Sequence, residues 1–156
     1  MNILFHFLFN YLFVDFITNG NAWNYLLVIF IFSVLIDLTH LPYLLKKGGN
    51  VVHERFGSES RTRFHEMYGL VLFSFLLSIA FFFIGPVLTG IAALCLLLHF
   101  SLDFISGKSM PFYPYWNKEV SLGMLPYGYR NKVVFEVVTT LILGVLFWLS
   151  IGSLVL

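Results

Sequence analysis

The chain has 156 residues, of which 59% are hydrophobic and only 11% are charged. A soluble domain of this size carries about 25% charged residues, so the composition excludes a water-soluble fold and predicts a single membrane-embedded domain. The formal net charge of +1 gives no indication of a nucleic-acid partner, and a single cysteine, Cys95, excludes an intrachain disulfide.

Five apolar segments follow one another along the chain. The turn formers from Thr18 to Asn21 end the first segment, and Gly85-Pro86 separates the third from the fourth. The first segment lacks a basic start and a cleavage site, so we expect a retained helix and no removable signal peptide. Each of the other four is near the roughly 20 residues that a spanning helix needs. The segments are residues 2–18, 23–45, 64–84, 87–106 and 132–156.

Many residues in these segments are β-branched or aromatic, which by itself would favour strands. In lipid, however, the backbone must form its hydrogen bonds within its own segment, so helices are favoured. We therefore predict an all-α integral membrane bundle of about five transmembrane helices, with residues 1–156 as one domain.

The basic residues predict the orientation, because all nine lie in two loops on the same side. By the positive-inside rule these loops are cytoplasmic, which places the N-terminus inside and the C-terminus outside an inner or plasma membrane. The residues are Lys46, Lys47, Arg55, Arg61 and Arg63 in the first loop, and Lys108, Lys118, Arg130 and Lys132 in the second.

Ionisable side chains within the spans suggest a functional site, because they are costly to bury in lipid. Four predicted helices carry such groups on the order of 5–12 Å inside the cytoplasmic boundary. His99 and Asp103 share a helix face, as do Asp37 and His40, whereas Asp15 lies at the opposite end of its helix. The converging set is His6, Asp37, His40, His65, Glu66, His99 and Asp103.

Imidazole and carboxylate groups together are the ligands of zinc and related divalent ions. Four or more such groups predict a site for one ion, or for two ions about 3.5–4 Å apart. The structural alternative is a hydrogen-bonded residue without a metal, for His6 by itself or for the pair of His99 and Asp103. We expect His53 and Glu54 to be solvated loop residues, and Glu136 to have an interfacial or structural role.

Four short motifs occur in an order that resembles a known family. They are "MNILFHFLFNYL", "IDLTHLPY", "RFHEMYGL" and "LLHFSLDFISGKSMPFYPYW". Together they resemble the membrane-bound metal-dependent hydrolases of the YdjM type over nearly the whole chain. That family is grouped with zinc-dependent phospholipases C and P1-type nucleases, which hold zinc through His-x-x-x-Asp/Glu motifs.

The resemblance implies a ligand set, with two departures from the family pattern. Thr39 stands where the family often has Asp, and the His-Arg pair that often precedes the third-helix histidine is missing. The loss of a carboxylate predicts one ion instead of several, or weaker activity. The implied ligands are His6, Asp37, His65, His99 and Asp103, with His40 as a further candidate.

The expected function is metal-dependent hydrolysis of an ester, with a lipid-like phosphoester favoured, at the cytoplasmic face. Asp37 or Glu66 would act as the general base. Lys108, Arg61 or Arg63 would attract an anionic head group. The alternative is a non-enzymatic membrane protein, either a metal or proton carrier that uses the same residues as a pathway or a structural subunit.

The loop from Gly107 to Asn131 contains the aromatic runs "MPFYPYW" and "LPYGYR". Aromatic residues of this kind favour the head-group level of the bilayer. The loop is therefore expected to be an interfacial anchor, or a lid beside the metal site.

Overall fold

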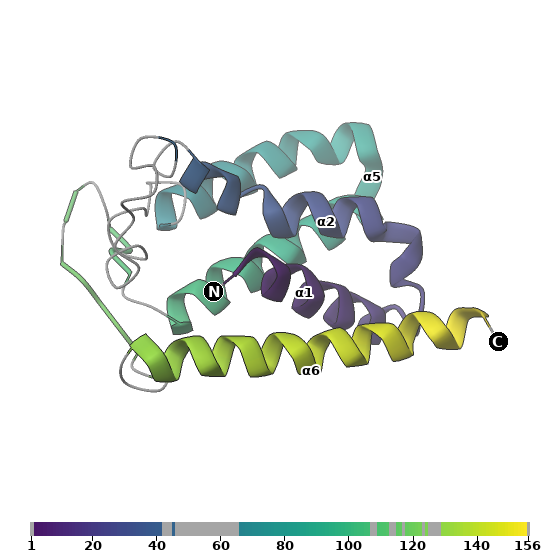
Figure 1. Ribbon diagram of the computed structural model, residues 1–156. Helices are drawn as coiled ribbons and strands as arrows, with labels where there is room; N and C mark the ends of the chain where they lie inside the picture. Colours follow the sequence, from purple (N-terminus) through teal and green to yellow (C-terminus); the bar gives the residue numbers. More distant parts are fainter. Residues whose placement is uncertain are drawn as a thin grey trace.

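The computed structural model describes residues 2–41, 45, 66–106, 109–112, 115–116, 118–122, 124 and 129–155, and its regular elements there are helical (Figure 1). An isolated antiparallel bridge joins Ser109 to Val120. This part of the chain therefore has the predicted all-α architecture. The elements are α1 (Ile3–Ile17), η1 (Ala22–Tyr25), α2 (Leu26–Val34), η2 (Asp37–His40), α5 (Met67–Ser106) and α6 (Tyr129–Val155).

Helix α1 has a clear signal at each end. The side chain of Asn2 accepts a hydrogen bond of 2.7 Å from the backbone N–H of Phe5, which caps the first turn. After Thr18 the backbone turns through Asn19 and Gly20, with φ values of 52° and 84°, a left-handed region that these two residues tolerate best. The predicted end of the first segment is therefore confirmed, and the chain returns through η1, α2 and η2.

A reversal divides α5 into two arms. Gly85 has φ 80° and ψ 172° inside the element, and Pro86 follows it. Figure 1 shows the chain turning back at this end of the bundle, so that residues 67–84 and 86–106 form two antiparallel arms. The second arm brings its C-terminal end back to the level of the N-terminus of α1.

Helix α1 lies in the middle of the bundle, in contact with α2, α5 and α6. Its Tyr11 is fully buried and packs edge-to-face on Phe147 of α6, with 4.7 Å between ring centroids. Val14, Ile29 and Cys95 belong to the same core cluster. The helix that is too short to span a membrane by length is thus the one that contacts all three of the other α-helices.

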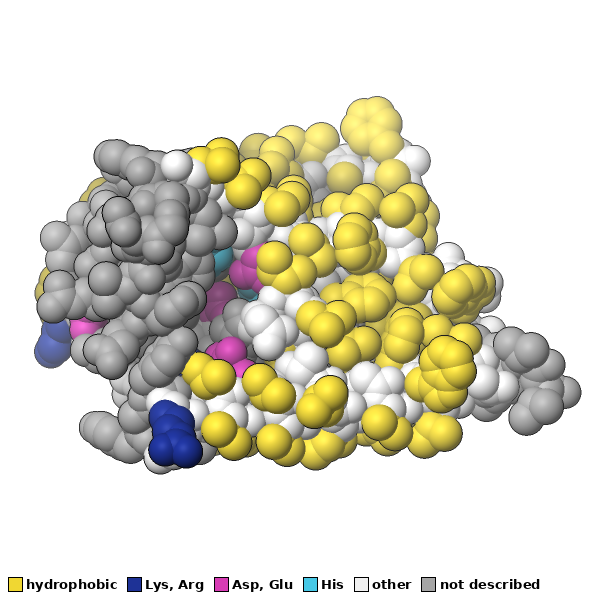
Figure 2. Space-filling model, viewed as in Figure 1, with side chains coloured by type: hydrophobic (Ala, Val, Ile, Leu, Met, Phe, Trp, Pro, Cys, Tyr) yellow, Lys and Arg dark blue, Asp and Glu magenta, His cyan; other side chains and the backbone are white. Residues whose placement is uncertain are grey.

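Three helical stretches are long and apolar enough to cross a membrane: Ala22–His40, Met67–Ser106 and Arg130–Gly152. Much of their hydrophobic surface is exposed, with Phe82 and Trp148 at 83% and 76%. Figure 2 shows hydrophobic side chains over most of one face, with charged side chains gathered at one end. The surface matches a lipid environment, because soluble proteins rarely expose contiguous apolar areas of this extent.

Candidate metal centre

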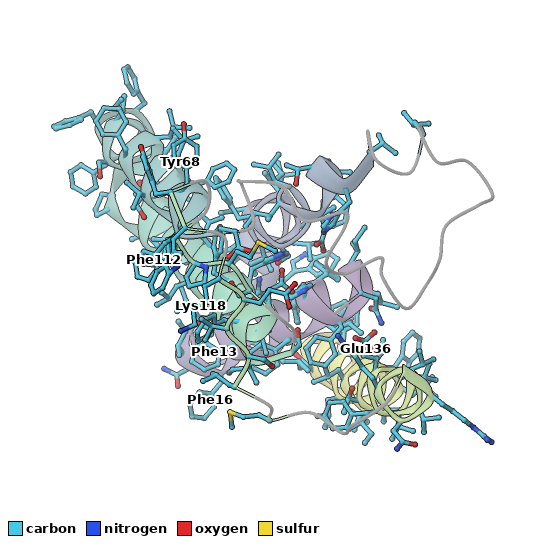
Figure 3. All side chains as sticks on the ribbon, turned by 90° about the vertical axis from the view of Figure 1, so that its left-hand side faces the viewer. Phe13, Phe16, Tyr68, Phe112, Lys118 and Glu136 are labelled. Atoms are coloured by element: carbon cyan, nitrogen blue, oxygen red, sulfur yellow. The ribbon has the colours of Figure 1, made fainter. Side chains whose placement is uncertain are left out.

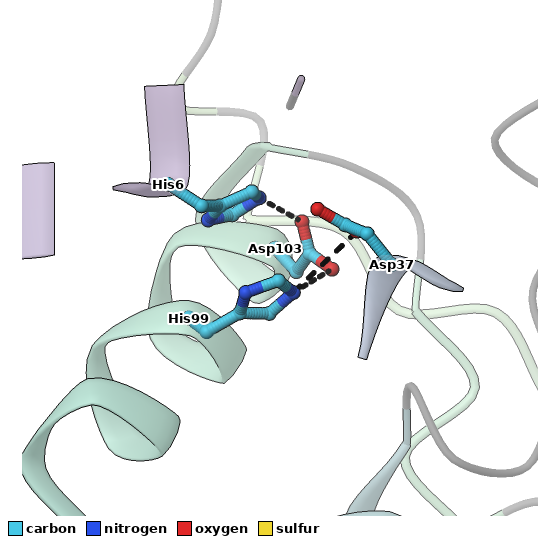
Figure 4. A group of neighbouring side chains, drawn as sticks. All are labelled: His6, Asp37, His99 and Asp103. Carbon is cyan, nitrogen blue, oxygen red and sulfur yellow. Dashed lines mark ion pairs between the residues drawn. The ribbon is translucent and has the colours of Figure 1, made fainter. Parts of the chain in front are cut away.

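Four buried side chains from three parts of the fold meet at one end of the bundle (Figure 4). His6 comes from α1, Asp37 from η2, and His99 and Asp103 from the last turns of α5. These four residues form the metal group. One possible ligand atom from each lies within 4.8 Å of the other three. The antiparallel course of α1 and the second arm of α5 explains the meeting, since the start of one helix lies beside the end of the other.

Asp103 lies between the two histidines, and Asp37 lies beside His99. Nε2 of His6 lies 3.2 Å from Oδ1 of Asp103, and Nε2 of His99 lies 3.6 Å from Oδ1 of Asp37. Nε2 of His99 also lies 3.7 Å from Oδ2 of Asp103. In a tetrahedral zinc site with bonds of about 2.0–2.2 Å, ligand atoms lie about 3.3–3.6 Å apart. The three separations are close to that range, so the donor set fits a small divalent ion.

A hydrogen bond to Ser33 fixes the ring of His99. Nδ1 lies 2.9 Å from the backbone oxygen of Ser33, which can only accept, so Nδ1 carries a proton. In the neutral ring Nε2 then presents a lone pair toward the oxygens of Asp37 and Asp103, which are acceptors as well. Such an arrangement needs a cation between its members, either a proton or a metal ion. Metal-binding histidines commonly have this kind of orienting hydrogen bond.

The stacking of the two imidazoles favours a metal ion over two protons. The rings of His6 and His99 are nearly parallel, at 17°, with centroids 3.9 Å apart. Two protonated rings at that separation would repel by about 4 kcal/mol at an effective dielectric constant near 20. A divalent cation held by the two rings and a carboxylate would avoid this repulsion and offset the negative charge of the carboxylates.

The structure places the other predicted residues elsewhere or does not describe them. His40 lies half-buried in η2 and is not a member of the four-residue group. His65, Lys108, Arg61 and Arg63 lie outside the described residues.

Glu66 is 4% exposed and binds the segment that follows α5. Its carboxylate accepts hydrogen bonds of 2.5 Å from Oγ of Ser109 and 3.0 Å from the backbone N–H of Met110. Both oxygens therefore hold the beginning of the aromatic loop in place. Figure 3 looks at the bundle from this end, with Phe112 and Lys118 of the loop on the α5 side, away from Glu136 on α6.

Asp15 does not join the metal group, as predicted. Its carboxylate accepts hydrogen bonds of 2.6 Å from Ser150 and 3.3 Å from the backbone N–H of Ala22. These bonds tie α1 to α6 and η1 at the far end of α1.

Sequence reasoning did not single out Asn10 and Ser33, two fully buried polar residues beside the site. The signal that could have found them is their spacing, because Asn10 follows His6 by one helical turn and Ser33 precedes Asp37 by one turn.

Comparisons with protein-family models, with curated proteins and with solved structures find no match to this chain.

Proposed function

We propose that this chain is a membrane-embedded, metal-dependent hydrolase that acts on an ester, favouring a lipid-like phosphoester, at the cytoplasmic face. The observation that carries the proposal is the buried group of His6, Asp37, His99 and Asp103, whose donor atoms lie within 4.8 Å of one another. The order of the four sequence motifs, which resembles the membrane-bound metal-dependent hydrolases, supports the reaction class.

The two histidines would hold the ion through nitrogen, and Asp103 through oxygen. Three such protein ligands, with the fourth position open for a water molecule, are the usual set of a catalytic zinc ion. When bound, such an ion polarises a phosphoryl oxygen and lowers the pKa of a water molecule toward neutrality.

The exposure of the ligands suggests the direction of approach. His6 and His99 are fully buried, whereas Asp37 and Asp103 are each 7% exposed. Figure 2 shows acidic and histidine side chains at the surface where the hydrophobic face ends. A lipid has its ester groups at such a border, so an amphiphilic substrate would reach the aspartate side without leaving the membrane.

Asp37 is the favoured general base. It lies on the more open side of the group, and its Oδ1 is only 3.6 Å from Nε2 of His99. A carboxylate in this position can take a proton from a water molecule that attacks the ester. Glu66, the other predicted base, has both oxygens bonded to Ser109 and Met110, which favours an anchoring role.

The proposal includes five membrane crossings, with the N-terminus in the cytoplasm. The two arms of α5 would each cross once, and α1 would cross in contact with α2, α5 and α6. The described basic residues Lys118, Arg130 and Lys132 precede α6 or begin it, on the side of the metal group. This distribution agrees with the positive-inside rule.

A carrier function would use the same group as part of a pathway across the membrane. Such a pathway needs polar groups at both ends, and Asp15 is the acidic residue at the far end of α1. The bonds from Ser150 and Ala22 give this carboxylate a structural role, which favours the hydrolase over the carrier.

The test is metal analysis of the purified protein in detergent micelles, together with hydrolysis of a phosphodiester and of a short-chain phospholipid. We expect about one divalent ion per chain and metal-dependent hydrolysis. His99→Ala should lose both, whereas the control His40→Ala should keep the metal. If the purified protein contains metal but hydrolyses neither substrate, the proposed hydrolase activity is refuted. If the parent protein contains no metal, the chain is better described as a structural membrane protein.

A further inference from the structure

A second polar layer lies one helical turn further into the bundle than the metal group. It consists of the side chains of Asn10 and Ser33 and the backbone carbonyl of Cys95. Nδ2 of Asn10 donates hydrogen bonds of 2.8 Å to Oγ of Ser33 and 3.2 Å to the carbonyl oxygen of Cys95. A single amide group thus joins α1, α2 and α5.

Each member of this layer is four residues from a member of the metal group on the same stretch of chain. Asn10 follows His6, Ser33 precedes Asp37, and Cys95 precedes His99. Residues four apart lie one above the other on a helix, so each contact of the layer sets the position of the ligand in the next turn.

Two contacts reach His99 itself. The backbone oxygen of Ser33 accepts from Nδ1 of His99, at 2.9 Å. The carbonyl of Cys95 is also the helical partner of the His99 N–H, four residues on. Asn10 therefore holds both residues that orient His99: Ser33 contacts its imidazole ring, and Cys95 contacts its backbone N–H.

The orientation of the Asn10 amide is defined by chemistry. The carbonyl of Cys95 can only accept, so the nitrogen and not the oxygen of Asn10 must face it. The oxygen of Asn10 is left buried without a hydrogen-bond partner among the described residues. A side chain in this state is a poor source of stability, because an unsatisfied buried oxygen is costly.

We infer that Asn10 and Ser33 are positioning residues of the metal site, which set the spacing of the three ligand-bearing segments and the ring orientation of His99. The inference rests on the proposed metal centre. It makes a distinctive prediction: removal of the layer should weaken metal binding without a matching loss of stability. In Asn10→Leu no donor or acceptor is newly stranded, since Ser33 can bond within its own helix and Cys95 keeps its helical partner.

The experiment is a cobalt titration of the metal-free protein in micelles, with zinc competition and a thermal melt of the metal-free form. Cobalt is chosen because its visible absorption reports the coordination geometry directly. Asn10→Leu should bind the ion about 10–100-fold more weakly, the usual effect of losing such orienting contacts. Ser33→Ala keeps the backbone bond to Nδ1 of His99 and should lose less affinity. Both cobalt spectra should change. The metal-free melting temperature of Asn10→Leu should stay near that of the parent, whereas that of Ser33→Ala should fall, because a buried N–H of Asn10 loses its acceptor.

The matched control is Ser150→Ala, which also removes a hydrogen bond between helices, the one of 2.6 Å to Asp15. Asp15 is nine residues from His6, or about 14 Å along α1, so the control should lower the melting temperature and leave the cobalt affinity unchanged.

Parent-like affinity and spectra in both layer variants would overturn the inference while leaving the metal centre in place. In Asn10→Leu, a loss of affinity matched by an equal loss of metal-free stability would assign the layer a purely structural role. If Asn10→Leu does not fold, the smaller Asn10→Ala, which also strands no partner, decides between these outcomes. A parent that binds neither cobalt nor zinc would refute the metal centre and, with it, this inference.

Discussion

Substitution of Gly85 tests how the chain delivers His99 and Asp103 to the site. Gly85 has φ 80° and ψ 172°, a conformation that is essentially restricted to glycine. A Cβ atom there would meet no atom within 4 Å, so steric contact with neighbours contributes nothing. The cost of Gly85→Ala is therefore local to the backbone, at about 1–3 kcal/mol. Alanine also stiffens the unfolded chain by about 0.4–1 kcal/mol, which leaves a net loss of about 1–2 kcal/mol.

Gly90 is the matched control, because it lies in the helical part of the same element and its Cβ would also meet nothing within 4 Å. In a helix interior alanine is favoured over glycine by about 0.5–1 kcal/mol. Gly90→Ala should therefore raise stability, whereas Gly85→Ala should lower it. The sign of the change depends on the backbone conformation alone, since the side chain added is the same.

The measurement is equilibrium unfolding in mixed micelles of a mild detergent and SDS, followed by circular dichroism. Metal affinity should stay near that of the parent in both variants, because residue 85 is 14 positions from His99, about 21 Å along the helix. Equal stability of Gly85→Ala and the parent, or a shift of the same sign in both variants, would refute the reversal of the chain at Gly85.

Three further predictions concern the site and its setting. Asp103→Asn keeps the shape of a side chain that lies 3.2 Å from His6 but removes its charge, so the bound metal should fall well below one ion per chain by elemental analysis; an unchanged content would remove Asp103 from the ligand set. Glu66→Gln should keep the metal, and its weaker bond to Ser109 should speed proteolytic cleavage of the chain next to Ser109. A loss of turnover of about 10²–10⁴-fold with the metal retained would instead make Glu66 the base. Reporter fusions to the two termini should report opposite compartments, with the N-terminus inside, and a shared compartment would rule out an odd number of crossings.

The sequence alone determined the class of fold and the main breaks in the chain. Apolar segments of about 20 residues favour helices that can cross a membrane, so no tertiary information was needed to predict an all-α architecture with apolar helices of that length. Thr18–Asn21 and Gly85-Pro86 ended helices where predicted, because turn residues act on the local backbone. The pairing of His99 with Asp103 followed from helical spacing for the same reason.

Tertiary structure decided which ionisable residues meet. Asp37 and His40 share a short stretch of chain, yet Asp37 joins the metal group and His40 does not. Glu66, which the sequence made a candidate base, binds the backbone and hydroxyl of a loop more than 40 residues away. Asn10 and Ser33 show only their spacing from His6 and Asp37 in the sequence, whereas the contact through which they join three helices depends on the tertiary structure. Depth in the membrane can be counted along a helix, whereas the direction in which a side chain points also depends on how the helices pack against one another.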